Sequence, residues 1–241
     1  MARSRSSDNS ISRASRKDLK KRSKNKVSPA LKASLRRPEP SRNQRKAILI
    51  ATEDAKSAKL YFEGWRNKLR THRLVVIADH AGSAPNNVVE AAKDARDARR
   101  RQADAGEEDQ FEEVWVSFDT EGPQNPDRLA QARNAIERAR QLGFLTAVSN
   151  PCFEYWLLLH FVYFVRPIEN GAAACKLLRK HIPKYGKGLK CFDIIYPNTD
   201  TARERANRVF EERHKYSSTH PCDCHPCTEV HKLVESLLGE D

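Results

Sequence analysis

The sequence lacks the glycine-rich signatures of the common nucleotide-binding enzymes. Only 9 of its 241 residues are glycine, and it contains no Gly-x-x-x-x-Gly-Lys-Ser/Thr loop and no Gly-x-Gly-x-x-Gly fingerprint. The first absence argues against a P-loop ATPase, and the second disfavours a dinucleotide-dependent oxidoreductase. A Gly-x-Ser-x-Gly elbow is also missing, which argues against a serine hydrolase of that type.

Long apolar runs are missing as well. No stretch approaches the roughly 20 apolar residues that a membrane-spanning helix requires. Charged residues make up 32% of the chain. The amino-terminal region is basic and rich in serine, without the apolar segment of a secretory signal. We therefore expect a cytoplasmic protein that does not enter a membrane.

Acidic and aromatic residues are scarce at the start of the chain. Residues 1–46 hold 16 Lys and Arg residues against three acidic ones, a net charge of +13, whereas residues 47–241 hold 28 basic and 29 acidic residues, a net charge of −1. Without aromatic side chains, residues 1–46 cannot bury enough apolar surface to offset the entropy of ordering. We interpret them as a disordered basic tail that either attracts polyanions or keeps the protein in solution.

From residue 47 onward, short apolar runs alternate with longer amphipathic segments. This order predicts an α/β domain over residues 47–150, with a parallel sheet of about four strands flanked by helices. Residues 151–241 have mostly helical patterns, and we expect them to form an extension packed on that domain. The periodicity predicts strands over 47–52, 74–78, 113–118 and 144–149, and helices over 54–69, 88–103, 127–142, 171–181, 201–214 and 228–238.

Acidic residues follow three of the predicted strands where the strands end. Glu53 follows the first strand, Asp119 and Glu121 follow the third, and Glu154 lies shortly after the fourth. The carboxyl ends of parallel strands form one edge of a sheet, so these carboxylates can converge there. Mg²⁺ or Mn²⁺ needs few protein ligands, because it keeps waters and bridges to substrate phosphates. We predict that Asp119 and Glu121 bind such a metal, with Glu53 as a third ligand.

Each of these residues also has a structural explanation. Glu53 can stabilise the start of the next helix, and Asp119 can form an Asx turn before Gly122. However, an extended Asp-x-Glu directs both side chains to the same side, which favours a metal-binding pair. Glu154 can form a salt bridge with a Lys or Arg of a neighbouring helix.

Glu154 lies in a segment that is apolar nearly all round, as in a helix buried on every side. If Asn150 caps this helix and Pro151 is its first residue, Glu154 is the fourth residue and lies past the capping-box position. A buried acidic residue is costly unless it is paired or bound to a metal. We therefore expect Glu154 at the rim of the same site.

The segments around these acidic residues resemble a known family. A strand ending in Glu and a later strand ending in an acidic pair are similar to the TOPRIM domain of topoisomerases, primases and related nucleases. More specifically, residues 45–238 resemble the RloB-like family of bacterial phage-defence proteins. The segments that carry the resemblance are 48–53, 61–64, 114–119, 150–161, 184–188 and 230–235.

The resemblance implies a metal-dependent nuclease in phage defence or abortive infection, acting on RNA or DNA. It implies that Glu53 is a general acid or base and that Asp119 and Glu121 bind the metal. Asp54 stands where the family has Gly, and Glu121 stands where it has Asp. These departures leave open a second function: a catalytically degenerate module that binds nucleic acid or a partner and acts with a separate ATPase.

Two further groups of residues are candidates for binding. Lys56 and Lys59 follow the first acidic residue, and we expect them to contact nucleic acid phosphates. Cys222, Cys224 and Cys227 are clustered and can bind Zn²⁺, although a second Cys-x-x-Cys pair is missing. The alternative for these cysteines is a set of reduced thiols in an exposed loop.

Overall fold

A computed structural model gives the fold of most of the chain. The predicted basic tail lies outside the described residues, except for Lys46, which pairs with Glu113. No helix in the described parts of the chain combines the length and apolar character needed to cross a bilayer. The structure describes residues 46–53, 56–70, 74–78, 84–106, 108–215 and 220–239.

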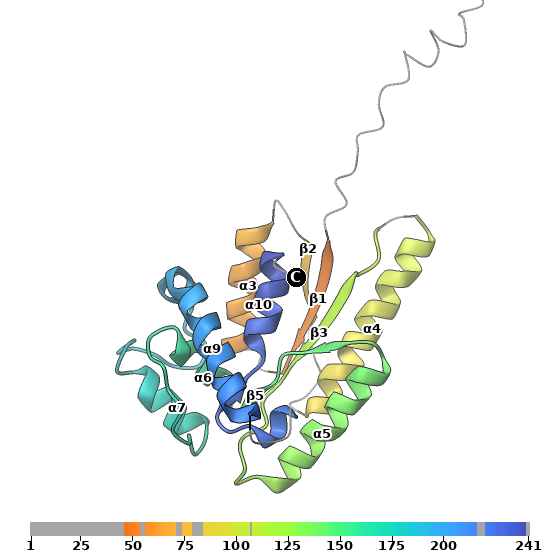
Figure 1. Ribbon diagram of the computed structural model, residues 1–241. Coiled ribbons are helices and arrows are strands. Elements are labelled where there is room, and N and C mark those ends of the chain that lie inside the picture. Colours follow the sequence, from red (N-terminus) through yellow and green to blue (C-terminus); the bar gives the residue numbers. More distant parts are fainter. Residues whose placement is uncertain are drawn as a thin grey trace, which may run out of the picture. The chain divides into compact units, whose positions relative to one another are not determined.

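Parallel strands form the central sheet (Figure 1). Their order across the sheet is β2-β1-β3-β4, and each neighbouring pair is parallel. This arrangement confirms the predicted α/β fold. The strands are β1 (Ala47–Thr52), β2 (Leu74–Ala78), β3 (Glu113–Ser117) and β4 (Leu145–Thr146).

Strand β1 is buried along its whole length. Its side chains alternate between the two faces of the sheet, as the pleat requires. Ile48 and Ile50 belong to one hydrophobic core, and Leu49 and Ala51 belong to the other. An uninterrupted apolar run is therefore typical of this position, because a central parallel strand is covered on both faces.

Helices cover both faces of the sheet. In Figure 1, α4 and α5 lie together on one side, and α3 and α10 lie on the other. Each helix contributes its apolar side to the core on its own face. These helices are α3 (Ser57–Leu69), α4 (Pro85–Asp104), α5 (Pro126–Gln141) and α10 (Val230–Leu238).

The start of α5 is defined by its sequence. The Asn125 side chain accepts a hydrogen bond of 3.1 Å from the Arg128 backbone N–H, and Pro126 is the first helical residue. Helical spacing then brings Arg128 to the same face as the buried alanines of this helix. Those alanines are Ala132, Ala135 and Ala139.

The chain after residue 150 is mainly helical and packs on the α3 face. Phe153 and Trp156 contact Tyr61 edge-to-face, with ring centroids 5.6 Å and 6.3 Å apart. This part of the chain therefore shares a core with the sheet. Its elements before α10 are α6 (Phe153–Leu159), α7 (Gly171–Leu178), α8 (Phe192–Ile195), α9 (Thr199–His214) and the 3₁₀ helices η1 (Tyr196–Asn198) and η2 (Pro221–Asp223).

The structure corrects the prediction for residues 144–149. The β4 ladder with β3 covers Leu145–Thr146. The pairing then continues irregularly, through the Ala147 N–H to the Val116 carbonyl and a parallel bridge between Asp119 and Ser149, where β5 (Ser149–Asn150) begins. Strand β5 pairs antiparallel with β6 (Cys227–Thr228). Asn150 is therefore a strand residue and does not cap α6, and the N-cap is Cys152. As a result, Glu154 is the second residue of α6.

Candidate functional site

The candidate site lies at the carboxyl ends of β1 and β3. The chain leaves β1 toward β2 on one side of the sheet, and leaves β3 toward β4 on the other. Ligands of open α/β sheets bind at such a switch point, because the connections diverge there and leave a crevice. Glu53 directly follows β1, and its N–H donates to the Ser117 carbonyl at 2.9 Å. Asp119 lies two residues after β3.

Glu53 is engaged on both carboxylate oxygens. Its Oε2 accepts the backbone N–H of Asp119 at 3.0 Å, so the loops after β1 and β3 are joined directly. Its Oε1 pairs with the guanidinium of Arg128. The Arg128 Nε also donates to the Asp119 carbonyl at 3.2 Å. Arg128 thus stabilises the negative charge of Glu53 and the conformation of the following loop.

Glu154 is the most deeply buried of the predicted acidic residues, with a relative exposure of 1%. Its Oε1 accepts the hydroxyl of Ser57 at 2.9 Å and the hydroxyl of Tyr185 at 3.3 Å. The Nζ of Lys187 lies 3.9 Å from the same oxygen. Its Oε2 is buried and has no hydrogen-bond partner. This oxygen is therefore left without a hydrogen bond from the described residues, in a carboxylate that also has the Cys152 thiol nearby.

Asp119 is close enough to both Glu53 and Glu154 to be affected by their charges. Burial raises its pKa well above the usual value, and the negative charges of Glu53 and Glu154 raise it further. The positive charge of Lys187 and the backbone N–H of Phe153 act in the opposite direction. Burial also raises the pKa of Glu53, although the Asp119 N–H and Arg128 oppose this shift. Carboxylates crowded in this way favour uptake of a proton or of a cation.

Glu121 does not extend from β3 as predicted. Its backbone is left-handed, with φ at 61°, so the alternation of an extended Asp-x-Glu does not hold. Its exposed carboxylate accepts the Asn125 side-chain amide at 2.8 Å and lies 3.9 Å from the Nε of Arg128. Asp119 and Glu121 therefore face different surroundings. Their pairing as metal ligands is not the arrangement seen here.

The predicted phosphate-binding lysines flank Ser57, which hydrogen-bonds to Glu154. Lys56 is exposed and immediately precedes α3, and Lys59 is half-buried within that helix. The start of α3 therefore contributes both a contact to the acidic cluster and an exposed cation next to it.

The pKa of Asp119 predicts how stability depends on pH. A raised folded-state pKa gives a stabilising contribution that is complete below the unfolded value, near 3.8, and is lost as pH rises through the folded value. We expect Asp119→Asn to gain stability relative to the wild type over that interval, by up to about 1.4 kcal/mol per pH unit. Urea unfolding with a chelator present, over a series of pH values, measures this difference. A difference that stays constant with pH, as expected for the exposed Asp127→Asn control, would contradict the prediction.

The three clustered cysteines are buried, so the exposed-loop alternative is wrong. Cys222 belongs to the core between the sheet and α5, whereas Cys224 and Cys227 pack with Val209. The Cys227 thiol donates to the Cys224 carbonyl at 3.0 Å. Among the residues that the structure describes, no group of three or more His, Cys, Asp or Glu side chains is arranged to hold a metal ion.

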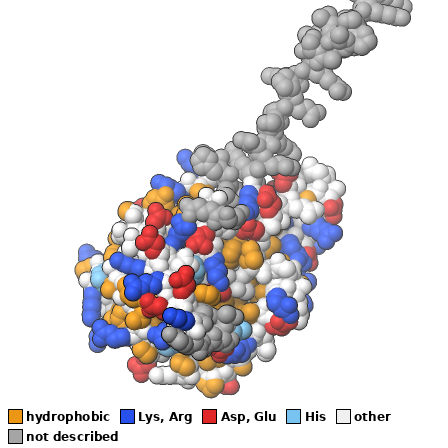
Figure 2. Space-filling view, in the orientation of Figure 1, with side chains coloured by type: hydrophobic (Ala, Val, Ile, Leu, Met, Phe, Trp, Pro, Cys, Tyr) orange, Lys and Arg blue, Asp and Glu red, His pale blue; other side chains and the backbone are white. Residues whose placement is uncertain are grey.

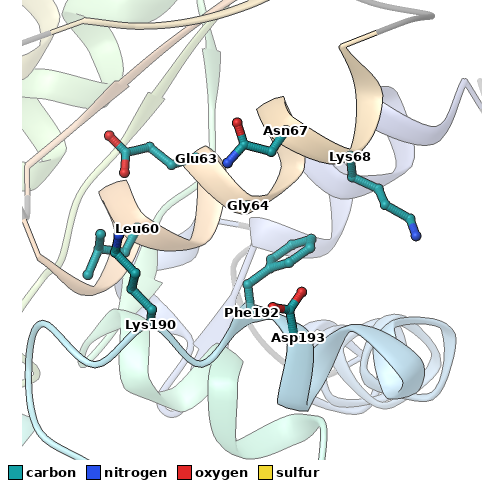
Figure 3. A pocket seen from close by; sticks show the side chains of 8 residues that line it. All are labelled: Leu60, Glu63, Gly64, Asn67, Lys68, Lys190, Phe192 and Asp193. Carbon is teal, nitrogen blue, oxygen red and sulfur yellow. The ribbon is translucent and has the colours of Figure 1, made fainter.

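A separate groove of about 400 Å³ lies between α3 and the start of α8 (Figure 3). Its lining includes two acidic and two basic side chains, so its charge is balanced. Gly64 faces the ring of Phe192 there, and a Cβ at this position would lie 2.2 Å from the Phe192 Cγ. A larger residue at position 64 would therefore clash with the Phe192 ring. None of the carboxylates at the switch point lines this groove.

The fold and the acidic cluster define a class of protein. They describe a parallel α/β protein with carboxylates gathered at the switch point of its sheet. The model of the RloB-like protein family matches residues 48–237, and the chain belongs to this family. No curated protein and no solved structure matches the sequence significantly.

Several residues of the site were not predicted from the sequence. Arg128 could have been found, because it has the same helical spacing as the buried alanines of α5. Tyr185 and Lys187 lie within segment 184–188, which carries part of the family resemblance. Ser57 has no such signal, since a serine after a lysine is common at the start of a helix.

Proposed function

We propose that this protein is a metal-dependent nuclease that hydrolyses phosphodiester bonds in a phage-defence system. The observation that carries the proposal is the acidic cluster at the switch point, where Glu154 has a buried, unpartnered carboxylate oxygen beside Asp119. A divalent cation would bind the unpartnered oxygen of Glu154 and would also offset the negative charge of the neighbouring carboxylates. Mg²⁺ requires only one or two protein carboxylates. The donor set therefore fits Mg²⁺ or Mn²⁺.

In this proposal, Asp119 and Glu154 hold the metal. When bound, the metal supplies charge stabilisation to the phosphoryl oxygens and activates water. Ser57 and Tyr185 orient the Glu154 carboxylate through their hydroxyl groups. Lys187 is close enough to contribute a positive charge toward a phosphate. Glu53 positions the Asp119 loop by accepting its backbone N–H.

Titration calorimetry with MgCl₂ or MnCl₂ tests the metal site. We expect the wild type to bind one ion, and Asp119→Asn or Glu154→Gln to bind it at least about 100-fold more weakly, because even the partners of metal ligands alter affinity by up to that factor. Asp127→Asn is the matched control, since it removes an exposed carboxylate of α5. Equal affinity in all four proteins would refute these two residues as ligands.

A second function is favoured by the engagement of Glu53. Both oxygens of this residue are occupied, by Arg128 and by the Asp119 N–H, and neither is available for proton transfer. This arrangement suits a degenerate module that binds nucleic acid or a partner and acts with a separate ATPase. The calorimetry distinguishes the two functions, because such a module takes up no ion that depends on Asp119.

A further inference from the structure

Positive charge in the folded part of the chain is concentrated in one segment. Residues 166–190 contain seven basic residues and a single acidic residue, Glu169, although residues 47–241 as a whole are close to neutral. Helix α7 lies in the middle of this segment. Figure 2 shows Lys and Arg side chains along the left side of the molecule, where Figure 1 has α7. This basic surface lies on the same part of the chain as Lys187 of the candidate site.

A groove of about 500 Å³ runs between α7 and the segment that precedes it. Ile168 and Leu177 line its apolar part, and Phe164 contributes an aromatic ring that is half-buried. Arg166 lies over this ring, with its guanidinium carbon 5.8 Å from the ring centroid. Lys176 and Lys180 complete the basic rim. Glu169 is the one acidic residue among the described residues of the lining, so the groove combines an aromatic surface with three cations and one carboxylate.

Among the described residues, the three cations of the groove are not neutralised by neighbouring carboxylates. Arg166, Lys176 and Lys180 are exposed, and none forms an ion pair with a carboxylate within the described part of the chain. Some exposed arginines elsewhere are paired, for example Arg138 with Glu90 and Arg208 with Glu212. An unpaired group of three cations around a groove attracts an anionic ligand.

The segment that bears the groove adjoins the candidate site at three places. A Cβ added at Gly171 would lie 3.9 Å from the Cys152 sulfur. Burial raises the pKa of this thiol, and the negative charges of Asp119 and Glu154 raise it further, so Cys152 lies near both carboxylates. The Glu169 carbonyl is 3.7 Å from a Cβ added at Gly122, three residues after Asp119. At the far end, Lys187 reaches Glu154. The segment that bears the groove therefore contacts the surroundings of the carboxylates at both of its ends.

We propose that this groove binds a single strand of nucleic acid and directs it to the carboxylate cluster, an inference that rests on the proposed nuclease function. Arg166, Lys176 and Lys180 contact successive phosphates, and a base stacks on Phe164. Proteins that bind single-stranded nucleic acid without sequence preference combine a basic groove, which follows the phosphates, with aromatic rings on which the bases stack. A groove of about 500 Å³ is in the size range of pockets that hold a small molecule such as a nucleotide.

Binding of a labelled oligothymidylate by the full chain, in EDTA so that no cleavage occurs, tests the groove. Each phosphate contact to a single strand contributes roughly fivefold at about 0.1 M salt, so Lys176→Ser/Lys180→Ser is expected to weaken binding roughly 25-fold and to flatten the salt dependence. Arg100→Ser/Arg101→Ser removes two exposed cations of α4 and serves as the matched control. Equal affinities and equal salt slopes for the two double variants would overturn the proposal.

Photocrosslinking distinguishes binding in the groove from binding by residues 1–46, because these basic residues also attract polyanions. A 5-iodouracil oligonucleotide is expected to crosslink to the peptide that contains Phe164, and the crosslink should disappear in Phe164→Leu. Crosslinks confined to residues 1–46 would overturn the groove. A polyglutamate peptide of equal charge serves as a competitor. If it displaces the labelled strand as efficiently as unlabelled oligonucleotide does, the groove binds an acidic protein instead.

The groove and the nuclease function fail in distinguishable ways. If the Lys176→Ser/Lys180→Ser variant binds the strand as well as its control while metal uptake is normal, the groove is wrong and the metal site stands. If the strand binds in the groove but no ion depends on Asp119, the groove stands and the nuclease function is wrong.

Discussion

Asp119→Asn is expected to lower phosphodiester cleavage by about 10³-fold or more. A bound metal supplies several kilocalories per mole of charge stabilisation in the transition state, and each 1.36 kcal/mol corresponds to about a factor of ten in rate. Loss of Asp119 removes the central carboxylate of the cluster, next to both Glu53 and Glu154. Cleavage of labelled RNA and DNA in saturating Mg²⁺ or Mn²⁺ measures the effect.

Two further variants make this experiment decisive. Asp127→Asn, on the exposed side of α5, should cleave at the wild-type rate. Glu154→Gln should resemble Asp119→Asn, whereas Glu121→Gln should lower cleavage by at most about 100-fold, because a residue that only supports a metal site typically alters its activity by 10- to 100-fold. If Glu121→Gln is as inactive as Asp119→Asn and Glu154→Gln is active, the sequence-based metal pair is right and our ligand set is wrong.

Arg128→Leu is expected to destabilise the fold by about 3–5 kcal/mol, the usual cost when one partner of a buried ion pair is removed. The side chains of Arg128 and Glu53 are only 9% and 12% exposed, so water cannot replace the lost guanidinium. The Nε contact to the Asp119 carbonyl is lost as well. Urea unfolding near neutral pH measures the change.

A second substitution, Glu53→Gln, tests whether the unpaired charge of Glu53 causes the loss of stability. In the Arg128→Leu background it removes the unpaired charge and should restore most of the stability. Acid should have the same effect on Arg128→Leu alone: the pKa of Glu53 is already raised from 4.5, so the penalty fades as pH falls through the raised value. A loss below about 1 kcal/mol, or no recovery in the double variant, would show that the pair does not stabilise the fold.

The order of strands and helices could be predicted because long periodic segments carry a strong signal. The strand at β1 and the helix over residues 127–142, observed as α5, were predicted for this reason. Strands β5 and β6 were missed, since two-residue strands have no periodicity. Their pairing depends on contacts far apart in the sequence. Ser149, for instance, hydrogen-bonds to Thr228 at 2.9 Å, 79 residues away.

The candidate site could be predicted in its elements but not in its geometry. Their positions at the ends of predicted strands identified Glu53 and Asp119 as candidate site residues, because adjacent parallel strands end at the same edge of a sheet. The left-handed backbone of Glu121 could not be predicted, since that conformation is uncommon for residues other than glycine. The partners of Glu154 come from α3 and from the loop after α7, so only the folded chain reveals them.

The pairing of β5 with β6 has a consequence for synthesis of the protein. The Asn150 side chain donates to the Cys222 carbonyl and contacts His225, and Glu229 accepts the Thr146 hydroxyl at 3.1 Å. The stretch that leads from β4 into α6 is therefore held by residues translated long afterwards. A nascent chain on the ribosome has its acidic residues in place early but lacks these supports. Until residues 222–229 have been synthesised, the stretch before Glu154 cannot form these contacts, so the arrangement of the carboxylates depends on both distant parts of the chain.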